Sequence, residues 1–359
     1  MNRATPGERL IHGMKAALGS LVVAALGVGI FTLLGIPLPW LLGSLTATML
    51  ASMVGWGFRL PLVFRRTAMV ILGLYAGSAL DRELLSGLLE WPLTMTAMLV
   101  LVILSTWAAS EYLQRRAGFD RATALMAAVP GAQSVVLVSC SRLGADERQV
   151  LLGQITRVIT VIYGVPLLLI TLGPWLDIDI ADSERAMGAS WPAFNATHWA
   201  MTVGFAVIGY LLARLLRLPQ PLLLGPLFGV AALQMAQLPA TEMPEQSLLA
   251  AQFLLGASIG SHFSHIGWRQ ALGILGHGFV AMLITLTLAL LMTGLLVMVT
   301  DFDPAALFLA FAPGGLPEIM LLAMALDIDP AFVVFHHLFR FVAIALCLPW
   351  VVTRLAGRQ

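Results

Sequence analysis

The sequence predicts an all-α integral membrane protein built from two inverted repeats, each with about five crossing helices and one broken or re-entrant helix. Three observations support this fold class: the composition, a duplicated register of charged and helix-breaking residues, and the charges of the loops. Of the 359 residues, 59% are hydrophobic and only 11% are charged, whereas a soluble domain carries about 25% charged residues. Because so little polar surface cannot cover a soluble globule, we expect the chain to lie in lipid.

Twelve apolar segments are expected to form the helices. The first six cover residues 15–34, 37–55, 67–84, 91–112, 121–143 and 149–173, and the second six cover 197–216, 219–238, 247–264, 274–299, 304–326 and 331–352. We therefore expect a first membrane repeat over residues 15–174, a polar linker over 175–197 and a second membrane repeat over 198–352. The first segment follows a basic stretch, as in a signal peptide. It is too long for one and further spans follow, so we expect a retained membrane helix.

The two halves share one register of residues that chance apolar similarity would not align. The stretch "LGIPLPWLLG" at 34–43 matches "LRLPQPLLLG" at 216–225. Further along, an offset of 183 residues pairs Asp120 with Asp303, Pro130 with Pro313, Gly131 with Gly314, Asp146 with Asp329, Arg157 with Arg340, and Pro166 with Pro349. This persistent pairing indicates an internal duplication.

The loop charges predict the orientation of each repeat. Arginines gather at the N-terminus and in the loops after the second and fourth segments, whereas the linker 175–197 has four acidic residues against Arg185 alone. Cytoplasmic loops are enriched in Lys and Arg. If segments 121–143 and 304–326 each enter and leave on one side, every arginine-rich loop and both termini become cytoplasmic. In an alternative topology these two segments are kinked but spanning, and another segment fails to cross.

The same two segments carry helix breaks. "FAPGGLPEIM" at 311–320 places two prolines, two glycines and Glu318 inside an apolar run, and Pro130 and Gly131 interrupt the first copy. Pro lacks the backbone donor, and Gly costs about 1 kcal/mol in a helix. Irregular backbone at membrane depth is tolerated where it is buried in protein or lines a cavity. Inverted repeats with broken helices are typical of secondary transporters.

"PGGLPEIM", followed by "HHLFR" at 336–340 and preceded by the duplicated proline box, resembles the bacterial AbrB membrane-protein family. That family has a tandem AbrB duplication and is distinct from the small DNA-binding regulator of the same name. The resemblance covers residues 15–352 and implies a bacterial inner-membrane protein similar in shape to duplicated transporters. Its labels include regulator of gene expression and ammonia monooxygenase. The first repeat departs to "PGAQSVVL" at 130–137, where Ala132 replaces the second glycine and Val135 stands in the place of Glu318.

Three charged side chains are the leading site candidates. Arg157 and Arg340 lie well inside their segments, where a charge costs about 2.5–3.5 kcal/mol and usually faces a cavity or a partner. They either have a structural role, tying down the carbonyls of the broken helices or pairing with Glu318, or bind an anion, or lie at the membrane interface. Glu318 lies in the first turn of the half-helix after Gly315. It either caps that helix or carries a proton or cation.

Further candidates surround the breaks. Gln133 and Ser134 are expected to line a polar site or to cap a helix, while Gly131, Gly314 and Gly315 supply close approach or a positive φ. Helix N-termini at such tips can bind anions. We expect Asp146 and Asp329 to be N-caps, and Cys140 and Cys347 to be small core residues.

The histidines do not form a recognisable metal site. His336 and His337 point about 100° apart on a helix, unlike an i, i+4 ligand pair, and His262 and His265 have no acidic residue or cysteine nearby. We expect neither a metal nor a cofactor. His337, one turn before Arg340, is instead expected to have a protonatable or hydrogen-bonding role.

The sequence therefore predicts an ion- or proton-coupled secondary transporter for a small, anionic organic solute. The main alternative is a membrane-embedded regulator or sensor, as the family label suggests. A membrane enzyme is the weakest reading, because no nucleophile triad is evident, and we expect no enzymatic activity. The net charge of +1, without a basic block, argues against direct nucleic-acid binding. A homo-oligomer is left open.

Overall fold

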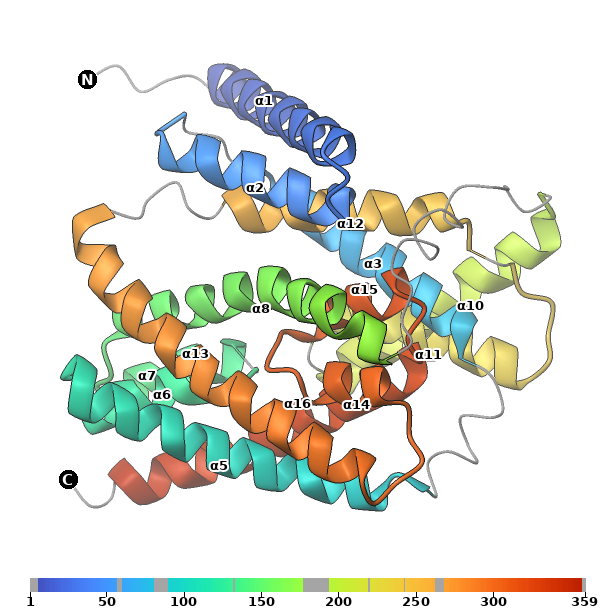
Figure 1. Cartoon of the computed structure of the whole chain (residues 1–359). Helices are drawn as coiled ribbons and strands as arrows, with labels where there is room; N and C mark the ends of the chain where they lie inside the picture. Colours follow the sequence, from blue (N-terminus) through green and yellow to red (C-terminus); the bar gives the residue numbers. More distant parts are fainter. Residues whose placement is uncertain are drawn as a thin grey trace. The chain divides into compact units, whose positions relative to one another are not determined.

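The computed structural model describes residues 6–56, 60–80, 90–131, 133–176, 194–218, 220–241, 243–261 and 268–356, and every regular element in these ranges is a helix. The first half of the chain contains α1 (Pro6–Leu33), α2 (Pro39–Met53), α3 (Leu62–Ala79), α5 (Pro92–Ala117), α6 (Arg121–Ala128), α7 (Gln133–Leu143) and α8 (Glu147–Leu176) (Figure 1). The second half contains α10 (Ala196–Leu215), α11 (Pro221–Met235), α12 (Glu245–Ser261), α13 (Trp268–Val297), α14 (Pro304–Phe311), α15 (Leu316–Ala325) and α16 (Pro330–Ala356).

The predicted all-α membrane fold is confirmed. Within the described ranges, six helices are long and apolar enough to cross a membrane: those at 16–33, 92–117, 147–169, 196–215, 275–297 and 330–354. By contrast, α2 and α11 each have 15 residues. At 1.5 Å per residue they measure about 22 Å, less than the hydrocarbon thickness of about 30 Å. The number of crossings in each repeat therefore stays a prediction.

The helix boundaries follow the register found in the sequence. Shifting α6 by 183 residues gives the bounds of α14, and the same shift moves the start of α8 onto that of α16. Shifting α2 by 182 residues gives the bounds of α11, and both helices begin at a proline, Pro39 and Pro221. Proline suits the first turn, where its missing N–H has no helical partner. The repeat boundaries at 15–174 and 198–352 themselves stay a prediction.

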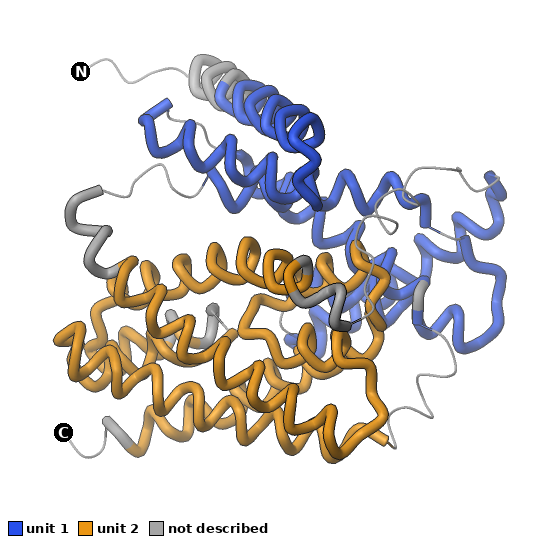
Figure 2. Tube along the Cα trace, in the orientation of Figure 1, with its two compact units in different colours: residues 1–82, 180–266 blue, residues 83–179, 267–359 orange. Residues whose placement is uncertain are grey.

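The chain folds into two compact units that each draw on both repeats (Figure 2). Unit 1 comprises residues 1–82 and 180–266, and unit 2 comprises residues 83–179 and 267–359. Unit 1 therefore contains the first part of each predicted repeat, and unit 2 contains the last part. The two halves of the chain are interleaved rather than folded separately.

Unit 1 is held together by glycines that let helices from different halves approach closely. In it, α2 packs against α12, and α3 packs against α11. A Cβ on Gly256 or Gly260 would overlap side-chain and backbone atoms of α2, and a Cβ on Gly73 or Gly77 would overlap backbone oxygens of α11. Both pairs have the Gly-x-x-x-Gly spacing that brings membrane helices into close contact.

Unit 2 arranges the long helices α5, α8, α13 and α16 around the two broken ones. The half-helix α6 packs against α5 and α8, and α14 packs against α13 and α16 in the equivalent way. The half-helices α7 and α15 both contact α16. Cys140 is buried here, as predicted, but the core assignment of Cys347 is wrong, because this side chain is exposed on the surface of the apolar helix α16.

Candidate functional site

Both predicted helix breaks are present. The first separates α6, which ends at Ala128, from α7, which begins at Gln133. The second separates α14, which ends at Phe311, from α15, which begins at Leu316. The predicted start of the second half-helix after Gly315 is therefore confirmed. Each break leaves helix-end carbonyls and N–H groups that need partners outside the helix.

The glycines at the breaks serve different purposes. Gly131 has a φ of +78°, which glycine adopts without strain. Gly314 and Gly315 have ordinary φ values, but an added Cβ would collide with Ile319 at the first and with the Glu318 carboxylate at the second. The first break therefore uses glycine for its backbone conformation, whereas at the second the absence of a side chain leaves room for Ile319 and Glu318.

The first break turns the chain back on itself. The backbone N–H of Asp146, just before α8, donates to the hydroxyl of Thr123 in the first turn of α6, with an N–O distance of 2.9 Å. At 1.5 Å per residue, α6 and α7 are about 12 and 17 Å long. Placed end to end, they would hold Thr123 and Asp146 far apart. The contact between the two ends is therefore the geometry that a re-entrant segment requires.

The predicted N-caps are confirmed. Asp146 accepts hydrogen bonds from the N–H groups of Arg148 and Gln149 at 2.9 and 3.2 Å, and Asp329 accepts one from Phe332 at 3.0 Å. These carboxylates satisfy free N–H groups at the starts of α8 and α16. The two long helices that carry the candidate arginines are thus anchored at their first turns in the same way.

Arg157 binds the end of the first half-helix. Its Nη1 donates to the carbonyl oxygen of Val129 at 2.8 Å, and its Nη2 donates to the side-chain oxygen of Gln154. Val129 is the C-cap of α6. Arg157 is 7% exposed, so a charge within unit 2 fastens the broken helix to α8.

Arg340 does the same at the second break with more bonds. Its Nη1 donates to the carbonyl of Ala312 at 2.9 Å, and its Nη2 donates to the carbonyl of Gly314 at 2.6 Å and to Nδ1 of His337 at 2.9 Å. Ala312 is the C-cap of α14 and lies 183 residues after Val129. The structural alternative considered for the arginines, in which they tie down helix-end carbonyls, is therefore realised at both breaks.

The sequence reading missed Gln154, which is the counterpart of His337 in the shared register. The amide nitrogen of Gln154 donates to the carbonyls of Met126 and Val129, both at 3.3 Å. Nε2 of His337 lies 2.9 Å from the carbonyl of Leu309, the residue equivalent to Met126. Applying the 183-residue offset to His337 would have found this pair.

The bonds of His337 assign its tautomer. Nε2 faces a carbonyl oxygen, which needs a donor, and Nδ1 faces an N–H of Arg340, which needs an acceptor. A neutral ring with its proton on Nε2 satisfies both. A second proton would point at the guanidinium, so this arrangement fits the hydrogen-bonding role considered for His337 and not the protonatable one.

Glu318 lies at the start of α15, where the sequence placed it. It is 6% exposed, and its carboxylate lies over Gly315, the N-cap of that helix. A carboxylate at this end favours the positive helix terminus. Among the described residues, however, no ion pair joins the carboxylate to either arginine.

Unit 2 brings the two breaks near each other. A Cβ on Gly131, in the first break, would lie 3.9 Å from Nε of Arg340, which holds the second break. A Cβ on Gly314 would lie 3.1 Å from a methyl group of Val161, which belongs to α8 of the first half. The backbone of each break therefore touches the long helix that supports the other.

Some candidate residues cannot be placed at this site. Gln133 and Ser134 begin α7, but their side chains lie outside the described part of the structure, as do Ala132, His262 and His265. His336 is fully buried, and its Nε2 lies 2.8 Å from the Thr94 hydroxyl. Within the ranges that the structure covers, no three His, Cys, Asp or Glu side chains are grouped to hold a metal ion.

Comparison with known proteins identifies the family. The sequence profile of the family described as "Transition state regulatory protein AbrB" matches residues 9–356. The chain belongs to the AbrB family. A relative from Bacillus subtilis (strain 168), "Uncharacterized protein YhjN", is 27% identical over 347 residues, covering 92% of this chain and 90% of the relative. The Escherichia coli (strain K12) protein "Putative regulator AbrB" is 28% identical over 335 residues, covering 92% and 94%. The predicted family resemblance is confirmed.

Proposed function

We propose that this AbrB-family membrane protein is a secondary transporter for a small, anionic organic solute. One observation carries the proposal: two buried guanidinium groups and one buried carboxylate, those of Arg157, Arg340 and Glu318, lie around two helix breaks within unit 2. Buried charges persist when they are paired or serve a ligand. With all three groups ionised, one positive charge is left over, and a bound monoanion would neutralise it.

The proposed coupling group is Glu318. Its carboxylate is buried at the N-terminus of a half-helix, beside a break. Gain or loss of a proton there changes the charge that the solute meets. Glu318 would therefore couple solute movement to a proton or, by holding a cation, to an ion gradient. We place the protein in the bacterial inner membrane, with both termini cytoplasmic. Membership of the AbrB family, with its bacterial relatives, supports the bacterial inner membrane, and the arginine-rich loops support cytoplasmic termini.

Reconstituted protein provides the test. Proteoliposomes should take up at least one radiolabelled compound from a panel of small mono- and dicarboxylates, with saturation and with dependence on an imposed proton or sodium gradient. Arg157→Leu should abolish this uptake, whereas Arg116→Leu, a change at an exposed position, should preserve it. Folded protein that moves no member of the panel under any gradient would contradict the proposal, as would equal uptake by wild type and Arg157→Leu.

The descriptions of the family and of the Escherichia coli relative favour a second candidate, a membrane-embedded regulator. A regulator would bind a solute without moving it. Binding to the purified protein without flux into proteoliposomes would support this candidate over transport. Flux would instead make any effect on gene expression an indirect result of solute level.

A further inference from the structure

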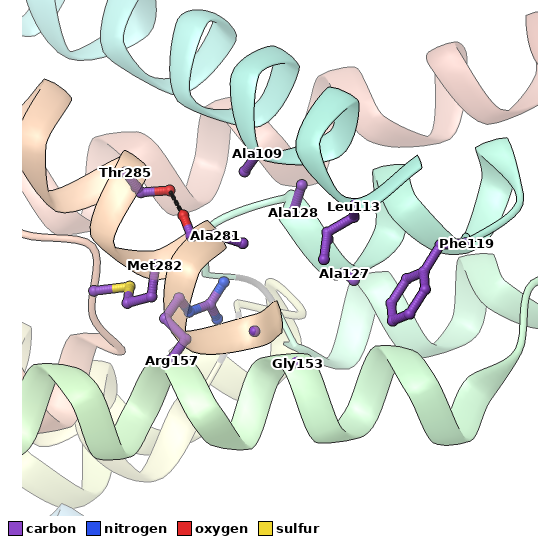
Figure 3. A pocket seen from close by; sticks show the side chains of 11 residues that line it. Ala109, Leu113, Phe119, Ala127, Ala128, Gly153, Arg157, Ala281, Met282 and Thr285 are labelled. Carbon is purple, nitrogen blue, oxygen red and sulfur yellow. Dashed lines mark hydrogen bonds between the residues drawn. The ribbon is translucent and has the colours of Figure 1, made fainter. Parts of the chain in front are cut away.

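A small cavity lies beside Arg157 in unit 2 (Figure 3). Helices α5, α6, α8 and α13 surround it, and small residues form much of its wall: Ala109, Ala127, Ala128, Gly153, Gly278 and Ala281. Its volume is about 20 Å³. A cavity needs about 10–15 Å³ to admit a water molecule, so this one has room for an oxygen-sized group.

The guanidinium of Arg157 lines this cavity. Figure 3 shows the side chain directed toward the space between Gly153 and Ala281. Its two terminal nitrogens are bonded to Val129 and Gln154, but Nε is buried and has no hydrogen-bond partner within the described part of the chain. A buried N–H of a charged group without a partner is costly. The guanidinium has five N–H groups, of which Val129 and Gln154 use two. A ligand oxygen in the cavity could therefore accept a hydrogen bond from a remaining N–H of a terminal nitrogen.

The equivalent space in the second repeat is filled. Under the 183-residue offset, Ala128 corresponds to Phe311 and Gly153 corresponds to His336. Both large side chains are fully buried, and their ring centroids lie 6.2 Å apart. His336 also stacks on Phe332 at 4.0 Å. Aromatic rings thus occupy the positions that open the cavity in the first repeat.

The two arginines also differ in the number of hydrogen bonds that they make. Arg340 binds three acceptors at the filled break, whereas Arg157 binds two at the open one. A purely structural clamp needs no cavity, as the second repeat demonstrates. Because small residues open the cavity in the first repeat and aromatic rings replace two of them in the second, the asymmetry points to a ligand on the first side.

We propose that the cavity beside Arg157 receives one oxygen of a carboxylate head group, which accepts a hydrogen bond from the Arg157 guanidinium, and that Phe311 and His336 close the equivalent site. The protein then binds one anion and not two. Arg157 contacts the solute, while Arg340 is a structural clamp. This inference rests on the proposed function for the identity of the ligand, and it assigns the head group to one of two symmetry-related positions.

Filling the cavity without disturbing the backbone tests the assignment. A Cβ added by Gly153→Ala would lie 3.4 Å from that of Ala127, an ordinary contact, so the variant should fold and reduce the cavity. Ala128→Phe, which copies Phe311, should fill it. Gly164→Ala on the same helix is the matched control, because its Cβ meets no atom within 4 Å.

The readout is binding of acetate, lactate and succinate to the purified protein, measured by calorimetry. We expect one equivalent of at least one probe to bind wild type and Gly164→Ala. Gly153→Ala should weaken binding about tenfold or more, and Ala128→Phe should abolish it. Wild-type affinity in both cavity variants would overturn the assignment, since the cavity would then hold only water. No binding of any probe to wild type would also overturn it.

The inference and the proposed function can fail separately. One-to-one binding that both cavity variants weaken, without flux in proteoliposomes, would leave the site standing and contradict transport. Flux and binding that both variants preserve would leave transport standing and move the head group elsewhere.

Discussion

Arg157 donates a hydrogen bond from Nη1 to the carbonyl oxygen of Val129, 28 residues earlier, at 2.8 Å. Val129 ends the half-helix α6, so its carbonyl has no partner in the helix. The bond recurs 183 residues later between Arg340 and Ala312. Because hydrocarbon offers no donor to a free carbonyl, a buried guanidinium makes each break tolerable at membrane depth. The two buried arginine charges are therefore part of what stabilises this fold.

Replacing each arginine with lysine should lower the thermal stability of the protein by different amounts at the two breaks. Lysine keeps the charge but loses the planar fork, and each carbonyl left without a donor costs about 1–3 kcal/mol. Arg340→Lys should lower the melting temperature of the purified protein more than Arg157→Lys, because Arg340 binds three acceptors and Arg157 binds two. Equal melting temperatures for both variants and for the exposed control Arg116→Lys would contradict the clamp role.

Much of the fold could be read from the sequence because its signals are local or periodic. The proline and glycine at each break, and the constant offset between Arg157 and Arg340, predicted broken helices with a buried charge beside each. The N-caps Asp146 and Asp329 followed from their positions before apolar runs. These features depend on backbone chemistry within a few residues, which a sequence displays directly.

The remaining features depend on which helices meet. In unit 1, α3 packs against α11, and α12 packs against α2. The close approach in these two pairs depends on four glycines: Gly73, Gly77, Gly256 and Gly260. The Gly-x-x-x-Gly spacing is visible in the sequence, but the helix that packs against it is not. The cavity was likewise unpredictable, because its walls come from four helices, α5, α6, α8 and α13, that are drawn from both halves of the chain.

The close helix contacts in unit 1 predict a strong sensitivity to added methyl groups. A Cβ on Gly260 would overlap the Thr48 hydroxyl and approach the Leu45 carbonyl to 2.6 Å. Gly260→Ala should therefore destabilise the protein by about 1–3 kcal/mol, as overpacking does. Gly204→Ala should be neutral or stabilising, because that glycine is helical and its Cβ meets nothing within 4 Å. Thermal unfolding in detergent measures both, and similar stability of the two variants would refute the contact.

Asp120 should contribute stability that acid removes. Burial raises the pKa of this N-cap carboxyl, but hydrogen bonds from the Thr123 hydroxyl and from the N–H groups of Thr123 and Ala122 outweigh it. The pKa is therefore lowered below its ordinary value of 3.8. The bonded carboxylate stabilises the fold above pH 3.8, and the contribution fades as the pH falls through the lowered value. Asp120→Ala should cost about 0.5–2 kcal/mol at neutral pH and much less in acid. A cost that does not vary with pH would contradict this account.

The contact between Thr123 and Asp146 predicts that both ends of segment 121–143 face one side of the membrane. Single cysteines at positions 116 and 148, in a background without Cys140 and Cys347, should react alike with an impermeant thiol reagent, and only from the cytoplasmic side. Position 182, in the linker outside the described residues, should react from the opposite side. Labelling of position 148 from outside, with position 116 protected, would make the segment a full span.

The last prediction concerns Glu318, whose buried carboxylate lies over Gly315 at the start of α15. If this group takes up and releases a proton during transport, wild-type flux must depend steeply on pH. Glu318→Gln keeps the size and the hydrogen-bonding capacity but removes the titration, so it should flatten that dependence while solute binding at Arg157 persists. Glu111→Gln, at a surface ion pair with Arg115, is the control and should leave the pH profile unchanged. If Glu318→Gln instead keeps the full pH profile and loses only thermal stability, the carboxylate is a helix cap, and the coupling proton must bind elsewhere.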